Sequence, residues 1–564
     1  MTPILIGWDA RGRPVELGPE ERESTHMHVI GGSGTGKSKF LEWMVRRDAR
    51  EGHGACVIDW HGTLYDDLLR YFAYQDVGRS GDDRSVVLLN PSQPDFVSGF
   101  NPFVRTAGDL SVQVSRRVDA TIRPWGVTDT NETPTFARLC RVLYTFMVEN
   151  AETLPNASLL LQFKNAALRA YAAAHVSDPM MRAEWEELIA ITKPDRWKDE
   201  VLSTKNRLVR FIGSKTVRRF MGLPAGNINL REIMDQGKIL LVNLAASDFL
   251  DREAARVFAS LLLNEFFETA MRRAAGPAKP KHFMLYLDEF QEYITDDVAA
   301  MLDQVRKGGL HMVLAHQHLG HFADNPKLMK SVFTNARIRA VFGGLGYEDA
   351  CTLGNEMFLP DLNTRQVKKA YYHTIHLYEE QTRTIRGRSW GSGSGYNVAA
   401  ASGSGVQTVP VEGWFGGDAV TSNSSFDSSS SSESFSESES ESETVVPVFV
   451  PIPVQELGSE AEWGREEKLS RVAEMLKFQQ QRHCFIKIDT EKTQPLKVPD
   501  VRAYGVSPEG MVEYQHEIYE RQGARPGAEI DERLSENEQR FLADAGLAAP
   551  VVRTGQRDPE EPWQ

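Results

Sequence analysis

Residues 27–38 of the chain read MHVIGGSGTGKS, and an apolar helical pattern follows directly over residues 40–45. The stretch passes from a short apolar run through glycines to Lys37 and Ser38, which fits the spacing G-x-x-x-x-G-K-[ST]. Glycines let backbone N–H groups turn towards a phosphate, and the following helix adds unpaired N–H groups and the positive end of its dipole. The stretch therefore predicts a strand, a phosphate-binding loop and a helix in an α/β fold.

Each residue of this loop has an expected role in nucleotide binding. We expect Lys37 to reach the β- and γ-phosphates of ATP, and the Ser38 hydroxyl to join the shell of a Mg²⁺ ion. The alternative is a glycine-rich turn without a ligand, which the agreement of residue types, spacing and context disfavours. The expected nucleotide-binding residues are Gly31, Gly34, Thr35, Gly36, Lys37 and Ser38.

A second motif lies much further along the chain, at residues 285–289. They read LYLDE, an apolar strand that ends in two acids, which is the form of a Walker B motif. Asp288 would hold Mg²⁺, directly or through water, and Glu289 would orient and polarise the attacking water. Many strands end in acids, so the motif is informative because a phosphate loop precedes it. The two motifs together predict a Mg²⁺-dependent ATPase.

Two more polar residues follow apolar runs and are expected at the same edge of the sheet. Gln317 comes just after residues 310–315 and could hydrogen-bond the γ-phosphate or the attacking water. Its alternative is a loop amide bonded to backbone. Asp59 ends the run 54–59, where it could face the Mg²⁺ region or cap the next helix. The sequence leaves these alternatives for Asp59 evenly balanced.

A phosphate loop alone hydrolyses ATP slowly, and a supplied arginine adds roughly 10³–10⁵ in rate. Three arginines near the last apolar runs are candidates, namely Arg306, Arg337 and Arg339. Most arginines are surface charges, and spacing does not choose among these three.

Strands that alternate with helices predict a doubly wound, mostly parallel sheet. Between residues 106 and 225 the pattern is helical instead, with periodicities over 135–150, 158–175, 180–191 and 196–212. A stretch rich in Gly, Ser and Glu is expected to be disordered because it cannot bury enough apolar surface. The predicted parts are a nucleotide-binding domain over 1–105 and 226–388, an all-α insertion over 106–225, a disordered Ser-rich segment over 389–444, a return to the ATPase domain over 445–520 and a charged tail over 521–564.

Composition narrows the classes of function. The net charge of −14 argues against a protein whose whole surface binds nucleic acid, although a local basic channel remains compatible with it. Residues 201–231 hold seven Lys or Arg and no acid, so they could contact phosphate backbones. The alternative, slightly favoured, is a solvated helix face that pairs with acids elsewhere.

The chain also carries signals about its compartment. Its four cysteines lie far apart, which favours a reducing, cytoplasmic environment without a structural metal site. No apolar run of about 18 residues predicts a membrane span. Charged residues within the first dozen positions argue against a signal peptide.

The order of motifs resembles the FtsK/HerA superfamily, and most of all the coupling ATPases of type IV secretion and conjugation. The resemblance covers roughly residues 1–385 and returns near 465–490, and it rests on the segments GGSGTGKS, VIDWHG, GKILLVNLA, LYLDEFQ, RKGGLHMVLAHQ and TNARIRAVFGGLGYEDA. It implies a RecA-like domain carrying an all-α domain, and a ring of six subunits that moves DNA through a central channel. It also implies phosphate binding by Gly36, Lys37 and Ser38, Mg²⁺ on Asp288, and catalysis by Glu289. Gln317 falls on the family's sensor glutamine, and Arg306 on the arginine that faces a neighbour's nucleotide.

One departure from that family concerns the membrane. Conjugative coupling proteins usually begin with transmembrane helices, whereas this sequence starts with the nucleotide-binding domain. Either a separate membrane component, or a relaxase on the DNA, recruits the protein, or it is a soluble HerA-like translocase in DNA processing or defence. A secretion ATPase that handles protein is a further alternative. The reading that the sequence favours is a DNA-translocating ATPase of conjugative or mobile-element transfer.

Overall fold

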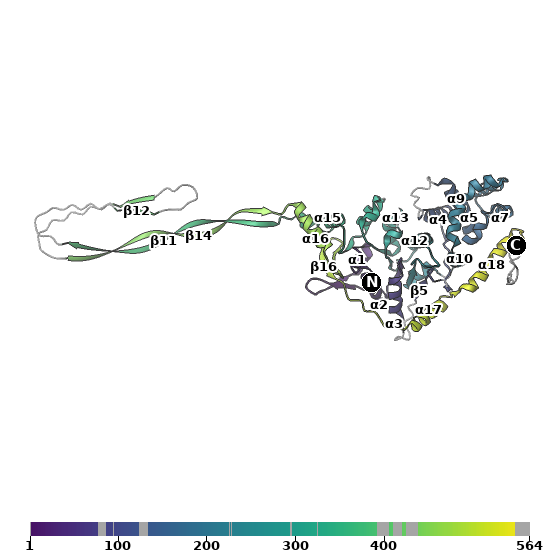
Figure 1. Ribbon diagram of the computed structural model, residues 1–564, viewed down its shortest axis with the longest axis horizontal. Helices are drawn as coiled ribbons and strands as arrows, with labels where there is room; N and C mark the ends of the chain where they lie inside the picture. The colour runs from purple at the N-terminus through teal and green to yellow at the C-terminus, as the bar shows by residue number, and fades with distance from the viewer. Residues whose placement is uncertain are drawn as a thin grey trace, which may run out of the picture. The chain divides into compact units, whose positions relative to one another are not determined.

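The computed structural model describes residues 2–76, 86–93, 95–122, 124, 133–224, 226, 228–293, 296–323, 325–391, 405–409, 420–424 and 438–547. The chain forms two compact units, Met1–Thr364 with Gly464–Gln564, and Arg365–Trp463 (Figure 1). No helix within the described ranges is long and apolar enough to span a bilayer.

The first unit is built on an eleven-stranded sheet. In spatial order its strands are β2 (Pro14–Leu17), β1 (Ile4–Trp8), β16 (Gln494–Lys497), β15 (His483–Ile488), β10 (Ile338–Phe342), β3 (Met27–Ile30), β9 (Leu310–His316), β8 (Phe283–Leu287), β4 (Gly54–Asp59), β7 (Ile239–Asn243) and β5 (Val86–Leu89). Strands from β10 to β5 pair in parallel, and the first four pair antiparallel. The predicted α/β class with a mostly parallel sheet is confirmed.

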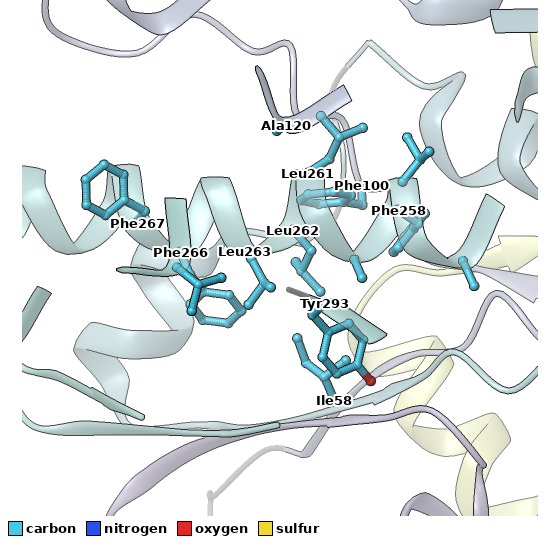
Figure 2. Packing of buried hydrophobic residues seen from close by; sticks show 14 of the residues in the cluster. Ile58, Phe100, Ala120, Phe258, Leu261, Leu262, Leu263, Phe266, Phe267 and Tyr293 are labelled. Carbon is cyan, nitrogen blue, oxygen red and sulfur yellow. The ribbon is translucent and has the colours of Figure 1, made fainter. Parts of the chain in front are cut away.

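Apolar runs without alternation explain the parallel part of the sheet, because its strands are buried on both faces. Alternate side chains enter two different cores. One core contains α2 (Lys37–Glu51) and α3 (Thr63–Asp76), and the other contains α12 (Arg252–Ala274). Figure 2 shows Leu262, Leu263 and Phe266 of α12 facing Ile58 of β4 and Tyr293. The strand carrying the phosphate loop is therefore held from both sides.

The remaining elements of this part surround the sheet. They are α1 (Pro19–Ser24), η3 (Phe290–Tyr293), α13 (Asp296–Gln304), η4 (Val305–Gly308), η5 (Leu319–Phe322), α14 (Pro326–Asn335), α15 (Tyr347–Asn363), α16 (Arg465–Lys477) and α17 (Pro508–Arg521). A short pair of strands, β6 (Phe96–Val97) and β17 (Arg525–Pro526), lies apart from the main sheet.

Between β6 and β7 the described residues form helices and no strand. These are α4 (Leu110–Ile122), α5 (Pro134–Asn150), α6 (Leu154–Leu159), α7 (Ala166–Ala174), α8 (Pro179–Ile189), α9 (Pro194–Gly213), α10 (Lys215–Met221) and α11 (Leu230–Gln236). The single helix expected over 158–175 is wrong, because α6 and α7 are separate. The buried Arg169 guanidinium donates to the carbonyls of Leu160, Gln162 and Phe163 in the turn between the two helices. These carbonyls therefore have hydrogen-bond partners without a continuous helix.

The charged tail expected after residue 521 contains an ordered helix, α18 (Gly527–Asp544). Its apolar side buries Ile530 and Phe541, and Phe541 packs against Phe146 of α5 and Tyr171 of α7. The expectation of a charged tail was wrong for these residues, because the charged side chains occupy one face of a helix whose other face is apolar. Residues 548–564 lie outside the described part of the chain.

The second unit is an antiparallel ribbon of β11 (Val367–Gly391) and β14 (Ser438–Glu462), with a small pair β12 (Gly405–Val409) and β13 (Val420–Ser424). The bounds of this second unit differ from the expected ones, in which residues 365–388 and 445–463 belong to the ATPase domain. Of the segment expected to be disordered, residues 389–391 and 438–444 form the ends of β11 and β14, and residues 405–409 and 420–424 form β12 and β13. Within the same segment, 392–404, 410–419 and 425–437 lie outside the described residues.

Prolines shape one edge of this ribbon. Pro447, Pro451 and Pro453 of β14 lie opposite Thr382, Tyr378 and His376, so all three have the same parity in the ladder. Proline has no N–H to donate, and within a continuous ladder it occupies positions whose nitrogen faces outward. The outer edge of β14 therefore lacks three of the donors along its apolar centre, which disfavours pairing with a further strand there.

Candidate functional site

The phosphate loop connects the end of β3 at Ile30 to the first residue of α2, Lys37. Gly34 and Gly36 have φ angles of 74° and 113°, in the left-handed region that favours glycine. A side chain at Gly31 would place its Cβ 2.5 Å from Cβ of Phe342 on β10. Glycine is thus required by backbone conformation at two positions and by close approach at a third.

Lys37 points into the loop that it follows. Its Nζ donates to the carbonyls of Gly31 and Gly32, at 2.7 and 2.9 Å. Burial lowers the pKa of Lys37, while the nearby carboxylates of Glu289 and Asp288 oppose that shift. The ammonium group therefore lies where phosphate oxygens would bind, with acids close by.

Ser38 and Asp288, the two residues expected to bind Mg²⁺, are in contact. Ser38 Oγ donates to Asp288 Oδ2 at 3.3 Å. Burial raises the pKa of Asp288 to about 7, and the neighbouring acids Asp59 and Glu289 add to the shift. A buried carboxyl whose pKa stays raised despite the nearby Lys37 ammonium fits a Mg²⁺ site, and Mg²⁺ takes few protein ligands when phosphates supply the rest. The described residues hold no group of three or more His, Cys, Asp or Glu that could hold a metal ion.

Glu289 lies at the end of the same strand and is held from several directions. Its backbone has a φ of 51°, a conformation uncommon for a non-glycine residue, and its N–H donates to Asp288 Oδ1 at 3.1 Å. Gln317 Nε2 donates to one carboxylate oxygen at 2.9 Å, and Gln291 Nε2 donates to the other at 2.6 Å. His61 Nε2 lies 3.6 Å from the first of these oxygens. The structure therefore brings Gln317 to Glu289, as its place after β9 suggested.

Asp59 caps a helix. Its two carboxylate oxygens accept from the backbone N–H groups of His61 and Tyr65, at 2.9 and 2.8 Å, at the start of α3. Of the two alternatives that the sequence left open, the structure favours the cap. Burial also raises the pKa of Asp59, and its charge contributes to the raised pKa of Asp288.

Residues 17–95 match the family model of the type IV secretion-system coupling protein DNA-binding domain. The structure is similar to the bacterial conjugative coupling protein TrwBdeltaN70 in its unbound monoclinic form, with 13% identity, coverage of 89% of this chain and 90% of that chain, and a TM-score of 0.50. The chain has the fold of a coupling protein. The trigonal form of TrwBdeltaN70 in complex with sulphate also matches, with 13% identity, coverage of 90% and 92%, and a TM-score of 0.51.

A third match is plasmid coupling protein TrwB in complex with ADP and Mg²⁺, with 15% identity, coverage of 62% of this chain and 78% of that chain, and a TM-score of 0.44. No curated protein sequence matches the chain significantly. The coupling-protein fold agrees with the resemblance that the sequence motifs indicated.

The candidate arginines lie at the other end of the strands in this coupling-protein fold. Arg306, in η4 before β9, donates to the carbonyl of Ser24, and Arg337 Nη2 donates to the same carbonyl at 3.3 Å. Arg339 is buried and donates to the carbonyl of Phe333. Because β9 separates Arg306 from Gln317 by about 20 Å of extended chain, Arg306 lies far from the phosphate loop site of the same chain.

The segment after α16 packs on the phosphate loop, which the sequence did not suggest. The backbone N–H of Arg482 donates to the carbonyl of Thr35 at 2.9 Å, and Gln481 Nε2 donates to the carbonyl of Gly34 at 3.0 Å. Gln291, His61 and this segment are the parts of the site that sequence reasoning missed. Gln291 had one available signal, since it is a polar residue two positions after Glu289.

Proposed function

We propose that the protein is a Mg²⁺-dependent ATPase that forms a ring and couples ATP hydrolysis to the movement of DNA in conjugative or mobile-element transfer. One observation carries the proposal: Lys37, Ser38, Asp288, Glu289 and Gln317 meet at the carboxyl edge of adjacent parallel strands. The similarity to conjugative coupling proteins supports a role in DNA transfer.

The residues divide the work of in-line phosphoryl transfer. Lys37 and the N–H groups of the loop bind the β- and γ-phosphates and balance their charge. Mg²⁺, held by Ser38 and Asp288, would neutralise charge between the β- and γ-phosphates. Glu289 orients the attacking water by accepting its hydrogen bond, and Gln317 fixes the carboxylate by donating a hydrogen bond to it.

Assembly completes this site in the proposal. The resemblance to ring-forming ATPases supports a homo-hexamer in which Arg306 of one subunit approaches the nucleotide of the next. Arg306 lies far from the site of its own subunit, which suits a role in a neighbour's site. A cytoplasmic ring of this kind would be recruited to the inner membrane by a separate secretion component, or to DNA through a relaxase.

Complementation between two inactive variants tests the role of Arg306. Lys37→Ala subunits lack nucleotide binding but keep their arginine, and Arg306→Ala subunits keep the phosphate loop. Mixed rings then contain some interfaces with both groups, so we expect partial recovery of ATPase activity when the two variants are mixed. Absence of recovery at every mixing ratio, with both variants assembled as the wild type is, would count against the role.

The basic stretch over 201–231 is mostly engaged within the protein. Arg210 pairs with Glu253 at 2.8 Å, Lys215 and Arg219 pair with Asp531 of α18 at 2.9 and 2.7 Å, and Arg231 pairs with Asp235 at 3.5 Å. These pairs favour the alternative in which the stretch is balanced by acids elsewhere. Lys205 and Arg218 are exposed, and they are the residues of the stretch that we expect to reach DNA phosphates.

Stimulation by DNA tests the proposed function. ATP hydrolysis by the wild-type protein is measured without DNA, with single-stranded DNA and with duplex DNA, at about 50 and about 200 mM salt, because phosphate contacts weaken strongly over this range. We expect DNA to raise the rate severalfold at the lower salt concentration and much less at the higher one. Hydrolysis that is indifferent to DNA at both concentrations would overturn the DNA role and favour a polypeptide-handling ATPase.

A further inference from the structure

The carboxylate of Glu289 is bound at both oxygens by amide groups from different elements. Gln317, after β9, donates to Oε1, and Gln291, in η3, donates to Oε2 with a distance of 2.6 Å. Each carboxylate oxygen has a second lone pair, so water can still bind. A carboxylate held at both ends has one orientation in its plane, which is the condition for aiming a water molecule.

The turn that carries Gln291 is anchored on both sides of it. Phe290 and Tyr293 are buried, and the Tyr293 ring meets Trp60 edge-on, with centroids 5.6 Å apart. Figure 2 shows Tyr293 beside Leu262 of α12. Glu292 accepts two hydrogen bonds from Arg256 of α12, at 3.1 and 2.6 Å. Gln291 thus lies between neighbours that are fixed to α12.

We propose that Gln291 is a positioning residue for ATP hydrolysis, which holds Glu289 in its active orientation and takes its own position from helix α12. The proposal rests on the proposed ATPase function. The side-chain oxygen Oε1 of Gln291 is buried without a hydrogen-bond partner among the described residues. The Gln291 amide is therefore held by the hydrogen bond that its Nε2 donates to Glu289. A residue that served only packing would not need an amide here.

Helix α12 also connects this turn to the helical region. One turn before Arg256, Glu253 pairs with Arg210 of α9 at 2.8 Å. The ion pairs of Glu253 and Glu292 therefore fix the same end of α12 to α9 and to the turn of Gln291. A shift of α12 would change the hydrogen bond that Gln291 makes with Glu289.

The first test removes the donor and keeps the size of the side chain. We expect Gln291→Leu to lower kcat about tenfold or more, as loss of a hydrogen bond to a charged group implies, with KM and the affinity for a non-hydrolysable ATP analogue within about twofold of wild type. Gln304→Leu makes the same change at an exposed position at the end of α13 and should leave all three values unchanged. A wild-type kcat for Gln291→Leu would overturn the proposal.

The second test separates positioning from packing by its dependence on pH. In Gln291→Glu the introduced carboxylate faces Glu289 at pH 8, so repulsion should reduce kcat below that of Gln291→Leu. At pH 6 a larger fraction of the introduced carboxyl is protonated, and its O–H can donate as the amide did. We expect the ratio of the Glu variant's kcat to the Leu variant's kcat to rise as the pH falls. A ratio that stays constant contradicts the proposal.

The outcomes also distinguish this inference from the proposed function. If the wild-type protein and Lys37→Ala show the same absence of ATP hydrolysis, the ATPase function itself fails. If the wild type hydrolyses ATP while Gln291→Leu matches it in kcat, the inference about Gln291 alone fails.

Discussion

Glu289→Gln is expected to bind ATP with wild-type affinity and to hydrolyse it roughly 10²–10⁴ times more slowly, the range that a positioned base contributes. The amide has nearly the same shape as the carboxylate, so Lys37 and the phosphate loop are not disturbed. It is, however, a poor acceptor for the protons of water. The amides of Gln317 and Gln291, which now donate to carboxylate oxygens, would also meet a group with one NH₂ end.

The measurement is single-turnover hydrolysis together with binding of a fluorescent ATP analogue. Glu348→Gln, an exposed change of the same kind in the first turn of α15, serves as the matched control. Turnover by Glu289→Gln within a few-fold of wild type would contradict the assignment of the catalytic carboxylate. Loss of nucleotide affinity in the same variant would point to a binding role instead.

Asp288→Asn is expected to stabilise the metal-free protein at pH 8 while it abolishes the response to Mg²⁺. Burial and neighbouring acids raise the pKa of Asp288 to about 7 in the folded state, against an unfolded value of 3.8. The folded state therefore binds more protons than the unfolded state between these values, so stability falls as the pH rises through that window. The full difference corresponds to about 4 kcal/mol above pH 7, and Asn avoids that loss.

Urea unfolding at pH 8 and pH 4 measures this effect. We expect Asp288→Asn to be more stable than wild type by up to about 4 kcal/mol at pH 8, and the gain to shrink below about 1 kcal/mol near pH 4, where the folded carboxyl is protonated and the unfolded one partly so. Nucleotide binding by the wild type, but not by the variant, should tighten with added Mg²⁺. A gain in stability that is independent of pH, or a less stable variant at pH 8, would contradict the electrostatic account.

The sheet could be predicted closely because its strands have a strong local signal. The apolar runs at 54–59 and 338–342 match β4 and β10 residue for residue, since strands buried on both faces consist mostly of apolar residues. Helix α12 was equally clear from its length. The residues of such an element determine its structure locally, so the sequence alone is enough to predict it.

The failures have a different physical cause, which is contacts that a local pattern of residues does not show. The break between α6 and α7 depends on Arg169, whose guanidinium satisfies carbonyls that a sequence pattern does not mark as free. The ribbon of β11 and β14 pairs residues on either side of a Ser-rich stretch. The composition of that stretch does not show that the segments before and after it pair with each other. Helix α18 was not predicted because composition does not show how residues divide between the faces of a helix. Its six acids outnumber its four buried or half-buried apolar residues, but the acids lie on another face.

The candidate site shows the same division. Lys37, Ser38, Asp288, Glu289 and Gln317 were found because each follows a strand that ends at one edge of the sheet. Gln291 and His61 reach Glu289 only through the conformation of their turns, and Arg482 reaches the phosphate loop from a distant part of the chain. Residues that act from loops need the three-dimensional structure.

The most direct test of the central claim is the release of phosphate from ATP by the purified wild-type protein, with Mg²⁺ and with EDTA in its place, and with Glu289→Gln as the blank. The account predicts steady turnover that requires Mg²⁺ and falls to the level of the blank in EDTA. Turnover that is the same in the wild type and the blank, or that persists without Mg²⁺, would contradict it.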